Sequence, residues 1–287
     1  MSVADMLIDG EDLEARLGDE RLRLYDCTTW LIPDPPRIYR VESGRTTFNE
    51  GHIPGADFLD LTGELSDPKS GFNFMMPAPA ALAKTLGAHG IGDDSEVVLY
   101  SRDTIQWATR VWWMMRAIGF DGASVLDGGF DRWQAEGRPI TTEIRQYPPA
   151  SLSPRPRPGL FCDSAAVLAA RDEPDTCVIN ALRPSLHNGS EAVNYGRPGR
   201  IPGSINVPGA SLLDPDTKGY RPLPELEQIF AEAGVMDAEK VVIYCGGGIA
   251  ASSDAFTLVR LGKESVTIYD ASMSEWANDL SLPMETS

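Results

Sequence analysis

The fold follows from residues 240–250, which read KVVIYCGGGIA. The apolar run at 241–244 is typical of a buried strand, and the residues after Ala250 have the pattern of a helix. Three successive glycines between them let the backbone curl, so that several N–H groups converge at the positive end of the helix dipole. The stretch therefore predicts a strand, an anion-binding turn and a helix, with the Cys245 thiol at the strand tip.

The same pattern occurs earlier in the chain, at residues 96–101, which read EVVLYS. Two further pairs match in the same order: GHIPGA at 51–56 with GRIPGS at 199–204, and VLD at 125–127 with IYD at 268–270. Between the copies, the proline-rich residues 147–159 favour an extended linker. We therefore predict two copies of one domain, at residues 1–145 and 160–287, joined by a linker at 146–159.

Within each half, short apolar runs alternate with longer amphipathic stretches. We predict strands at residues 23–26, 97–100, 177–179, 241–244 and 266–269, and helices at 80–86, 106–118, 164–171, 224–233 and 252–261. Asp163 is the predicted N-cap of the helix at 164–171. Apolar strands that alternate with helices are typical of an α/β fold, here two tandem domains, each with a central parallel sheet covered by helices on both faces.

Composition narrows the class of protein. The 287 residues carry a formal net charge of −17, which disfavours nucleic acid and anionic membranes as partners. No apolar run approaches the roughly 18 residues of a membrane span, and the first residues lack the pattern of a secretion signal, so we expect a soluble, cytoplasmic protein. The four cysteines form no Cys-x-x-Cys pair, which favours reduced thiols over disulfides or a zinc site.

These motifs together resemble the two-domain rhodaneses, the thiosulfate and 3-mercaptopyruvate sulfurtransferases. The resemblance rests on the tandem halves, GHIPGA at 51–56, LDGGF at 126–130, YDAS at 269–272 and CGGGIA at 245–250, and it extends from about residue 7 to residue 283. It implies a small α/β unit in each half and a catalytic cysteine in the second half alone. Ser101 stands where the first half would carry that cysteine.

The resemblance implies a sulfurtransferase that works through a persulfide on Cys245. The thiolate takes a sulfur from a small anionic donor, thiosulfate or 3-mercaptopyruvate. A thiol, cyanide or a protein thiol such as reduced thioredoxin then accepts it, and no metal or organic cofactor is required. The loop expected to hold the negative sulfur comprises Gly246, Gly247, Gly248, Ile249 and Ala250.

Three further residues are expected at the substrate. Arg183 and Arg197 correspond to arginines that bind the substrate carboxylate in mercaptopyruvate sulfurtransferases, and His52 corresponds to a first-domain histidine near the cleft. A guanidinium fork suits a carboxylate through paired hydrogen bonds. Each residue also has a structural alternative: an ion pair for the arginines, and a brace for the turn at 53–55 for the histidine.

The loop departs from both groups of the family. Thiosulfate-preferring members carry cationic residues after the cysteine, and mercaptopyruvate enzymes carry Cys-Gly-Ser-Gly. Gly246 and Gly247 supply neither the cations nor the serine hydroxyl. The neutral loop favours mercaptopyruvate but lacks the family's usual proton path. Asn180 and Arg200 also stand where the family commonly has aspartate and histidine.

Two other functions stay open. A persulfide carrier that docks on a partner protein would load once with a small donor and then stall. A cysteine-dependent phosphatase needs a cysteine followed by five residues and an arginine, and Ala251 stands at that position, so this alternative is the weaker one.

Overall fold

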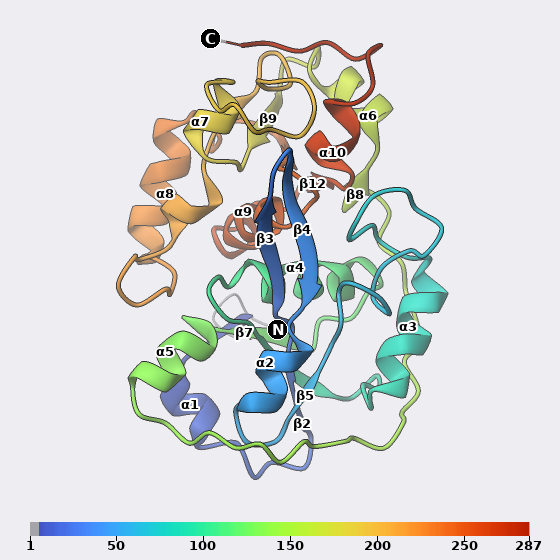
Figure 1. The fold of residues 1–287 in the computed structure, drawn as a ribbon, viewed down its shortest axis with the longest axis vertical. Helices are drawn as coiled ribbons and strands as arrows, with labels where there is room; N and C mark the ends of the chain where they lie inside the picture. Colours follow the sequence, from blue (N-terminus) through green and yellow to red (C-terminus); the bar gives the residue numbers. More distant parts are fainter. Residues whose placement is uncertain (1–5, 287) are drawn as a thin grey trace.

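The computed structural model describes residues 6–286 and contains two five-stranded parallel sheets (Figure 1). The first has the order β1-β7-β6-β2-β5, and the second, taken from its other edge, has the order β8-β12-β11-β9-β10. The two orders match strand for strand, so the predicted tandem α/β fold is confirmed. The strands of the first sheet are β1 (Leu7–Ile8), β2 (Leu22–Asp26), β5 (Ala56–Phe58), β6 (Glu96–Tyr100) and β7 (Ala123–Leu126). Those of the second are β8 (Phe161–Cys162), β9 (Thr176–Asn180), β10 (Ile205–Asn206), β11 (Lys240–Tyr244) and β12 (Val266–Tyr269).

Helices cover both faces of each sheet. The first half contains α1 (Gly10–Glu14), α2 (Arg45–Glu50), α3 (Pro79–Ala88), α4 (Gln106–Ala117) and α5 (Gly129–Ala135). The second half contains α6 (Ser164–Ala170), α7 (Pro184–His187), α8 (Leu223–Glu232), α9 (Ala250–Arg260) and α10 (Ser272–Trp276), with a short 3₁₀ helix at Gly209–Leu212. Within residues 6–286, none of the helices combines the length and apolarity that a membrane crossing would need.

The predicted helices form, with small shifts at their ends. Asp163 caps α6 as predicted, because its side chain accepts a hydrogen bond from the N–H of Ala166 at 2.9 Å. The largest shifts are two residues: α3 ends at Ala88 instead of residue 86, and α9 begins at Ala250 instead of residue 252. Ile249 already has helical dihedral angles, φ −85° and ψ −64°, so the helix starts directly at the end of the cysteine loop.

Alternating strand residues supply two core layers in each half. In β6, Val98 packs with Phe48 and Trp133 on one face of the sheet, and Leu99 joins Trp113 of α4 on the other. The second of these layers continues into the second half, since the cluster that contains Trp113 also contains the buried face of α9. The halves therefore share a core.

Helices α4 and α9 form the contact between the halves. The rings of Trp112 and Phe256 meet edge to face, with centroids 4.9 Å apart, and the hydroxyls of Thr109 and Ser252 lie 2.9 Å apart. This contact places the N-terminal ends of both helices at one cleft. The residues that follow β6 and those that follow β11 can therefore line the same site.

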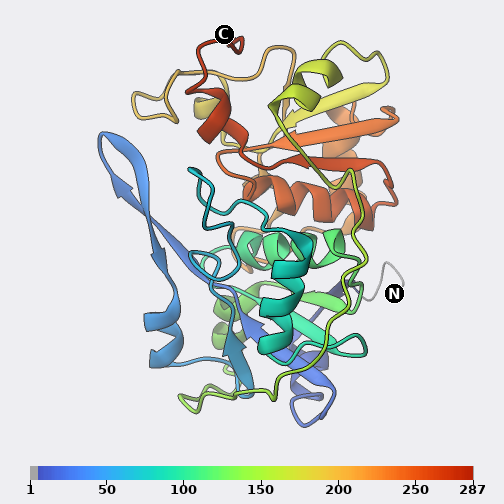
Figure 2. The same ribbon diagram turned by 90° about the vertical axis from the view of Figure 1, so that its right-hand side faces the viewer.

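A hairpin of β3 (Thr29–Asp34) and β4 (Arg37–Ser43) was not predicted from the sequence. Figure 2 shows that it projects from the first half and runs beside the second. Two prolines at its tip and charged residues within β4 interrupt the apolar alternation that would have indicated the strands. The hairpin carries side chains of the first half to the cysteine loop.

The predicted linker lies extended along the first half (Figure 2). Ala150 donates its N–H to the carbonyl of Gly87 at 2.8 Å, and Arg157 donates to that of Ala117 at 2.8 Å. Within residues 6–286, the stretch between α5 and β8 forms neither a helix nor a named strand. The boundaries at 145 and 160 stay predictions.

His89 lies between two carboxylates of the first half. Its Nδ1 is 3.3 Å from Asp57 and its Nε2 is 2.9 Å from Glu64, and hydrogen bonds to these two groups raise the pKa of His89 to about 9. A raised pKa means that the protonated ring stabilises the folded state. The contribution should be complete below about pH 6.5 and should vanish as the pH rises through about 9.

We therefore expect His89→Gln to destabilise the protein at about pH 6 and to have little effect at about pH 10. Urea unfolding of both proteins at the two pH values measures the difference. An equal loss of unfolding free energy at both values would contradict the ion pairs.

Candidate active site

Cys245 lies directly after β11, at the end of the sheet from which α9 departs. Its side chain is 2% exposed. Within residues 6–286, no oxygen accepts a hydrogen bond from the N–H groups of residues 246–249. These groups precede the N-terminus of an 11-residue helix, so they can donate hydrogen bonds to a negative sulfur or oxygen.

Helix α10 holds the backbone of this loop. The N–H of Cys245 donates to the hydroxyl of Ser272 at 3.0 Å, and the carbonyl of Cys245 accepts from Met273 at 3.1 Å. The carbonyl of Gly246 accepts from both the N–H and the hydroxyl of Ser274, at 2.9 and 2.7 Å. The backbone conformation of the loop is thus held by hydrogen bonds from α10.

A buried arginine of the first half lies behind the loop. Arg110 of α4 is completely buried and forms an ion pair with Asp270 of the second half at 2.7 Å. A methyl group on Gly248, whose φ is +76°, would lie 2.8 Å from Nη1 of Arg110. The same methyl group would lie 3.2 Å from the carboxylate of Asp270, so the loop packs against an ion pair to which both halves contribute.

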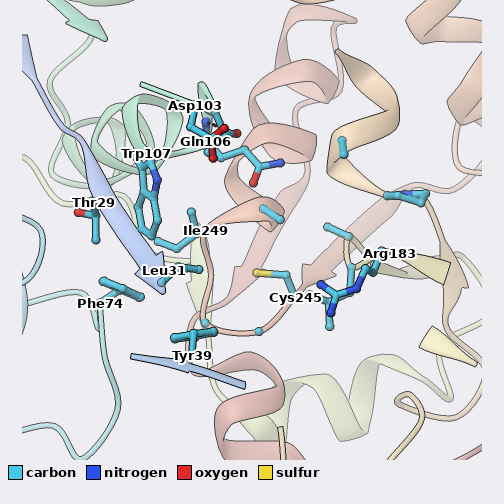
Figure 3. Close-up of a pocket in the computed structure, with 18 of the residues that line it drawn as sticks. Thr29, Leu31, Tyr39, Phe74, Asp103, Gln106, Trp107, Arg183, Cys245 and Ile249 are labelled. Carbon is cyan, nitrogen blue, oxygen red and sulfur yellow. Dashed lines mark hydrogen bonds between the residues drawn. The ribbon is translucent and has the colours of Figure 1, made fainter. Parts of the chain in front are cut away.

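The thiol opens into a cavity of about 360 Å³ between the halves. Figure 3 shows the sulfur of Cys245 pointing into it, with Arg183 on one side and Leu31, Ile249 and Tyr39 on the other. The charged side chains that line the cavity are Asp103 and Arg183. Most of the remaining wall is apolar or aromatic, with contributions from Trp30, Leu31, Phe74, Trp107, Leu182, Pro208 and Ile249.

Arg183 is the predicted substrate residue that the structure brings to Cys245. It lies at the N-terminus of α7, and its side chain is 57% exposed. Its Nε and Nη2 edge faces Glu191, with Nη2 at 2.5 Å from the carboxylate. Within residues 6–286, no acceptor is bound to Nη1, so this nitrogen can reach a ligand in the cavity.

Arg197 does not line the cavity. Its guanidinium donates four hydrogen bonds of 2.6–3.0 Å to backbone carbonyls at and beyond the end of α10, those of Trp276, Ala277, Asp279 and Leu282. These bonds use Nε, Nη1 and Nη2. The residue therefore supports the helix that holds the cysteine loop, in place of the predicted contact with substrate.

His52 is also part of the framework. It is completely buried and stacks on Phe48, and its two ring nitrogens lie 2.8 Å from the carbonyl of Phe48 and 3.0 Å from that of Glu143. With both nitrogens occupied, it has no group left for a substrate. Its ring joins α2 to the backbone of residue 143, which is neither the predicted substrate contact nor the alternative of a brace for the turn at 53–55.

The other candidates also lie outside the cavity wall. Arg200 pairs with Glu285, so it adds no free positive charge at the cleft. Burial raises the pKa of Cys162 to about 12 and that of Cys177 to about 11, and it raises the pKa of Cys27 well above its ordinary value. Among residues 6–286, no three His, Cys, Asp or Glu side chains gather in a way that could hold a metal ion.

Two tyrosines of the cavity were not predicted from the sequence. Tyr39 comes from the hairpin and Tyr195 from the loop before Arg197, and both line the cavity that contains Cys245. Neither lies in a recognisable motif or next to Cys245 in the chain. The one feature of the sequence that could have indicated a side chain packed against the loop was Gly246, since a residue without a side chain leaves room for a neighbouring group.

That glycine is required by Tyr195. A methyl group at Gly246 would lie 1.9 Å from the Tyr195 hydroxyl oxygen, whereas one at Gly247 would have no neighbour closer than 3.8 Å. We expect Gly246→Ala to lower the free energy of unfolding by about 1–3 kcal/mol, because the phenol or the loop must move. Gly247→Ala is the matched control and should stay within about 0.5 kcal/mol. Equal melting temperatures for the two variants would contradict the packing described.

A family model and curated relatives both match most of this chain. A model of the rhodanese-like domain matches twice, at residues 9–136 and 171–279. A probable 3-mercaptopyruvate sulfurtransferase of Pseudomonas aeruginosa is 32% identical over 285 residues, which cover 98% of each chain. The thiosulfate sulfurtransferase of Gallus gallus is 31% identical over 257 residues, which cover 89% of this chain and 86% of the relative.

A solved structure agrees with these relatives. The crystal structure of SseA from Escherichia coli, described as a 3-mercaptopyruvate sulfotransferase with the rhodanese fold, superposes with a TM-score of 0.81 at 26% sequence identity. The match covers 93% of this chain and 98% of SseA.

Proposed function

Because the chain belongs to the rhodanese-like family and is a sulfurtransferase, we propose that it moves a sulfane sulfur through a persulfide on Cys245. The observation that carries the proposal is the position of this thiol at a strand end, before a helix N-terminus and N–H groups that have no acceptor within residues 6–286. Such a position stabilises a thiolate and the negative outer sulfur of a persulfide alike. Splitting the transfer into two steps lets one site serve different acceptors.

The cavity favours 3-mercaptopyruvate over thiosulfate as the donor. Its wall holds one arginine, which is already paired with Glu191, and one aspartate, so it offers little compensation for a dianion. A single carboxylate could accept a hydrogen bond from Nη1 of Arg183, the guanidinium nitrogen without an acceptor within residues 6–286. The apolar wall suits the carbon body of the donor.

The acceptor must enter the same cavity after the donor fragment leaves. Cyanide and small thiols fit a space of about 360 Å³ between the halves. A protein thiol such as that of reduced thioredoxin would have to reach Cys245 through the cavity mouth, because the residue is 2% exposed. We therefore propose that small thiols or cyanide are the acceptors that react directly with the loaded Cys245.

Multiple-turnover kinetics test this function. With 3-mercaptopyruvate and a thiol acceptor, pyruvate should accumulate far beyond one equivalent of protein, and the specificity constant should exceed that for thiosulfate. A single equivalent of pyruvate followed by a stall would indicate a persulfide carrier. If 3-mercaptopyruvate released no pyruvate and thiosulfate released no sulfite, the proposal would be contradicted.

Arg183→Lys tests the donor anchor. The charge is kept, but an ammonium cannot bind Glu191 and a carboxylate with the same planar geometry. We expect the specificity constant for 3-mercaptopyruvate to fall about tenfold or more. Arg200→Lys is the matched control, because Arg200 pairs with Glu285 away from the cavity, and it should change the constant by less than about twofold. Equal constants for the two variants would remove Arg183 from the site.

A further inference from the structure

Two phenols lie at the nucleophile although they are far from it in the chain. Tyr39 belongs to β4 of the projecting hairpin, and its ring meets that of Tyr195 edge to face, with centroids 6.1 Å apart. The hydroxyl oxygen of Tyr195 lies so close to Gly246 that a methyl group there would be 1.9 Å away. Both residues line the cavity that contains Cys245, and Figure 3 shows Tyr39 in its wall.

Both phenols keep their protons at neutral pH. Burial and the negative charge of Cys245 raise the pKa of Tyr39 to about 12, against opposing hydrogen bonds to Tyr195 and Ser274. Burial, Tyr39 and Cys245 raise the pKa of Tyr195 well above its ordinary value. The two phenols are therefore protonated groups that pack against each other and line the same cavity as the Cys245 sulfur.

The reaction with 3-mercaptopyruvate requires such a group. In the proposed function, the Cys245 thiolate attacks the donor sulfur, an S–S bond forms and the C–S bond breaks. The electron pair of the C–S bond passes to the carbon fragment, which leaves as the enolate of pyruvate while the cysteine sulfur is oxidised to a persulfide. The donor thiol releases one proton and the enolate gains one, so protons and electrons balance without another reactant.

The glycine loop cannot supply that proton. Gly246 and Gly247 have no side chains, and the other charged groups of the cavity are a paired arginine and an aspartate. We propose that the phenol pair Tyr39–Tyr195 donates the proton to the leaving enolate and recovers the proton that the donor thiol loses. This inference rests on the proposed persulfide function and adds to it a proton path formed by both halves of the chain.

A two-step comparison separates proton delivery from positioning. Loading of Cys245 by 3-mercaptopyruvate, followed by pyruvate release in a single turnover, needs the proton. Discharge of the loaded enzyme by cyanide does not, because cyanide attacks the outer sulfur and Cys245 leaves as a thiolate. Tyr39→Phe and Tyr195→Phe should slow loading about a hundredfold and change discharge by less than about threefold.

Control variants complete the test. Tyr25→Phe removes a core phenol that donates to the carbonyl of His89, away from the cavity, and should change neither step. A Cβ at Gly247 would lie 3.8 Å from Phe74 and 3.9 Å from Ser274, so Gly247→Ser can place a hydroxyl on the loop. When this change is added to Tyr195→Phe, we expect the loading rate to rise at least tenfold.

Each outcome is decisive. Equal slowing of both steps would mean that the phenols only position the loop, and unchanged loading would mean that they do nothing in the reaction; either result overturns the inference. If Gly247→Ser did not restore loading to Tyr195→Phe, the claim that loading needs a hydroxyl as proton donor would be contradicted. If the parent enzyme itself gains no sulfur from 3-mercaptopyruvate, the proposed function fails first, independently of the variants.

Discussion

Replacing Cys245 with serine is expected to reduce sulfur transfer by at least a thousandfold, which corresponds to about 4 kcal/mol in the barrier. The hydroxyl is a far weaker nucleophile and cannot form a persulfide. Steady-state release of pyruvate from 3-mercaptopyruvate, with a thiol as acceptor, measures the loss. The fold should survive, because serine is close in size to cysteine.

Cys177→Ser, Cys162→Ser and Cys27→Ser should each retain turnover. Burial raises the pKa of all three thiols, so they stay protonated and unreactive at neutral pH. Ser101→Ala is the matching change at the end of β6 and should leave turnover within about threefold, since its hydroxyl donates to the nearby carbonyl of Thr104. Loss of turnover in a cysteine variant that still folds, or in Ser101→Ala, would contradict the assignment.

The second large effect is expected from Arg110→Met. The change leaves the carboxylate of Asp270 buried without its cation, which costs about 3–5 kcal/mol, and it removes a hydrogen bond of 2.5 Å to the carbonyl of Phe74. The melting temperature should fall by about 10 °C. Thermal unfolding followed by circular dichroism measures it.

Arg116→Met is the matched control on the same helix. Arg116 pairs with Asp121 at 3.5 Å near the surface, so its loss should cost less than about 1 kcal/mol. Equal melting temperatures for the two variants would show that the pair of Arg110 and Asp270 does not hold the halves together. A normal stability of Arg110→Met would lead to the same conclusion.

Much of the fold could be predicted because its signals are local. The apolar run of β11 has a close copy in β6, and both are continuous because parallel strands are buried on both faces. Cys245 was recognisable for the same reason, since the strand, the glycines and the helix that position it are adjacent in the chain. Asp163 was predictable as a cap because a cap depends on the next three residues.

The rest of the site depends on contacts that sequence spacing does not encode. Arg197 resembles a substrate ligand by its position in the motif, but carbonyls about 80 residues later occupy its guanidinium. Tyr39 reaches Cys245 through a hairpin whose strands lack a clear apolar alternation. Arg110 and Asp270 belong to different halves, so their pairing follows from the docking of α4 against α9 and not from either segment alone.

The most direct test of the central claim is the mass of the intact protein after exposure to 3-mercaptopyruvate without an acceptor. The parent should gain about 32 Da, the mass of one sulfur, and fragmentation should place that sulfur on the peptide that contains Cys245. Cyanide should then remove it, and Cys245→Ser should gain nothing. A gain of one sulfur on Cys27, Cys162 or Cys177, or no gain in an enzyme that turns over, would contradict the account.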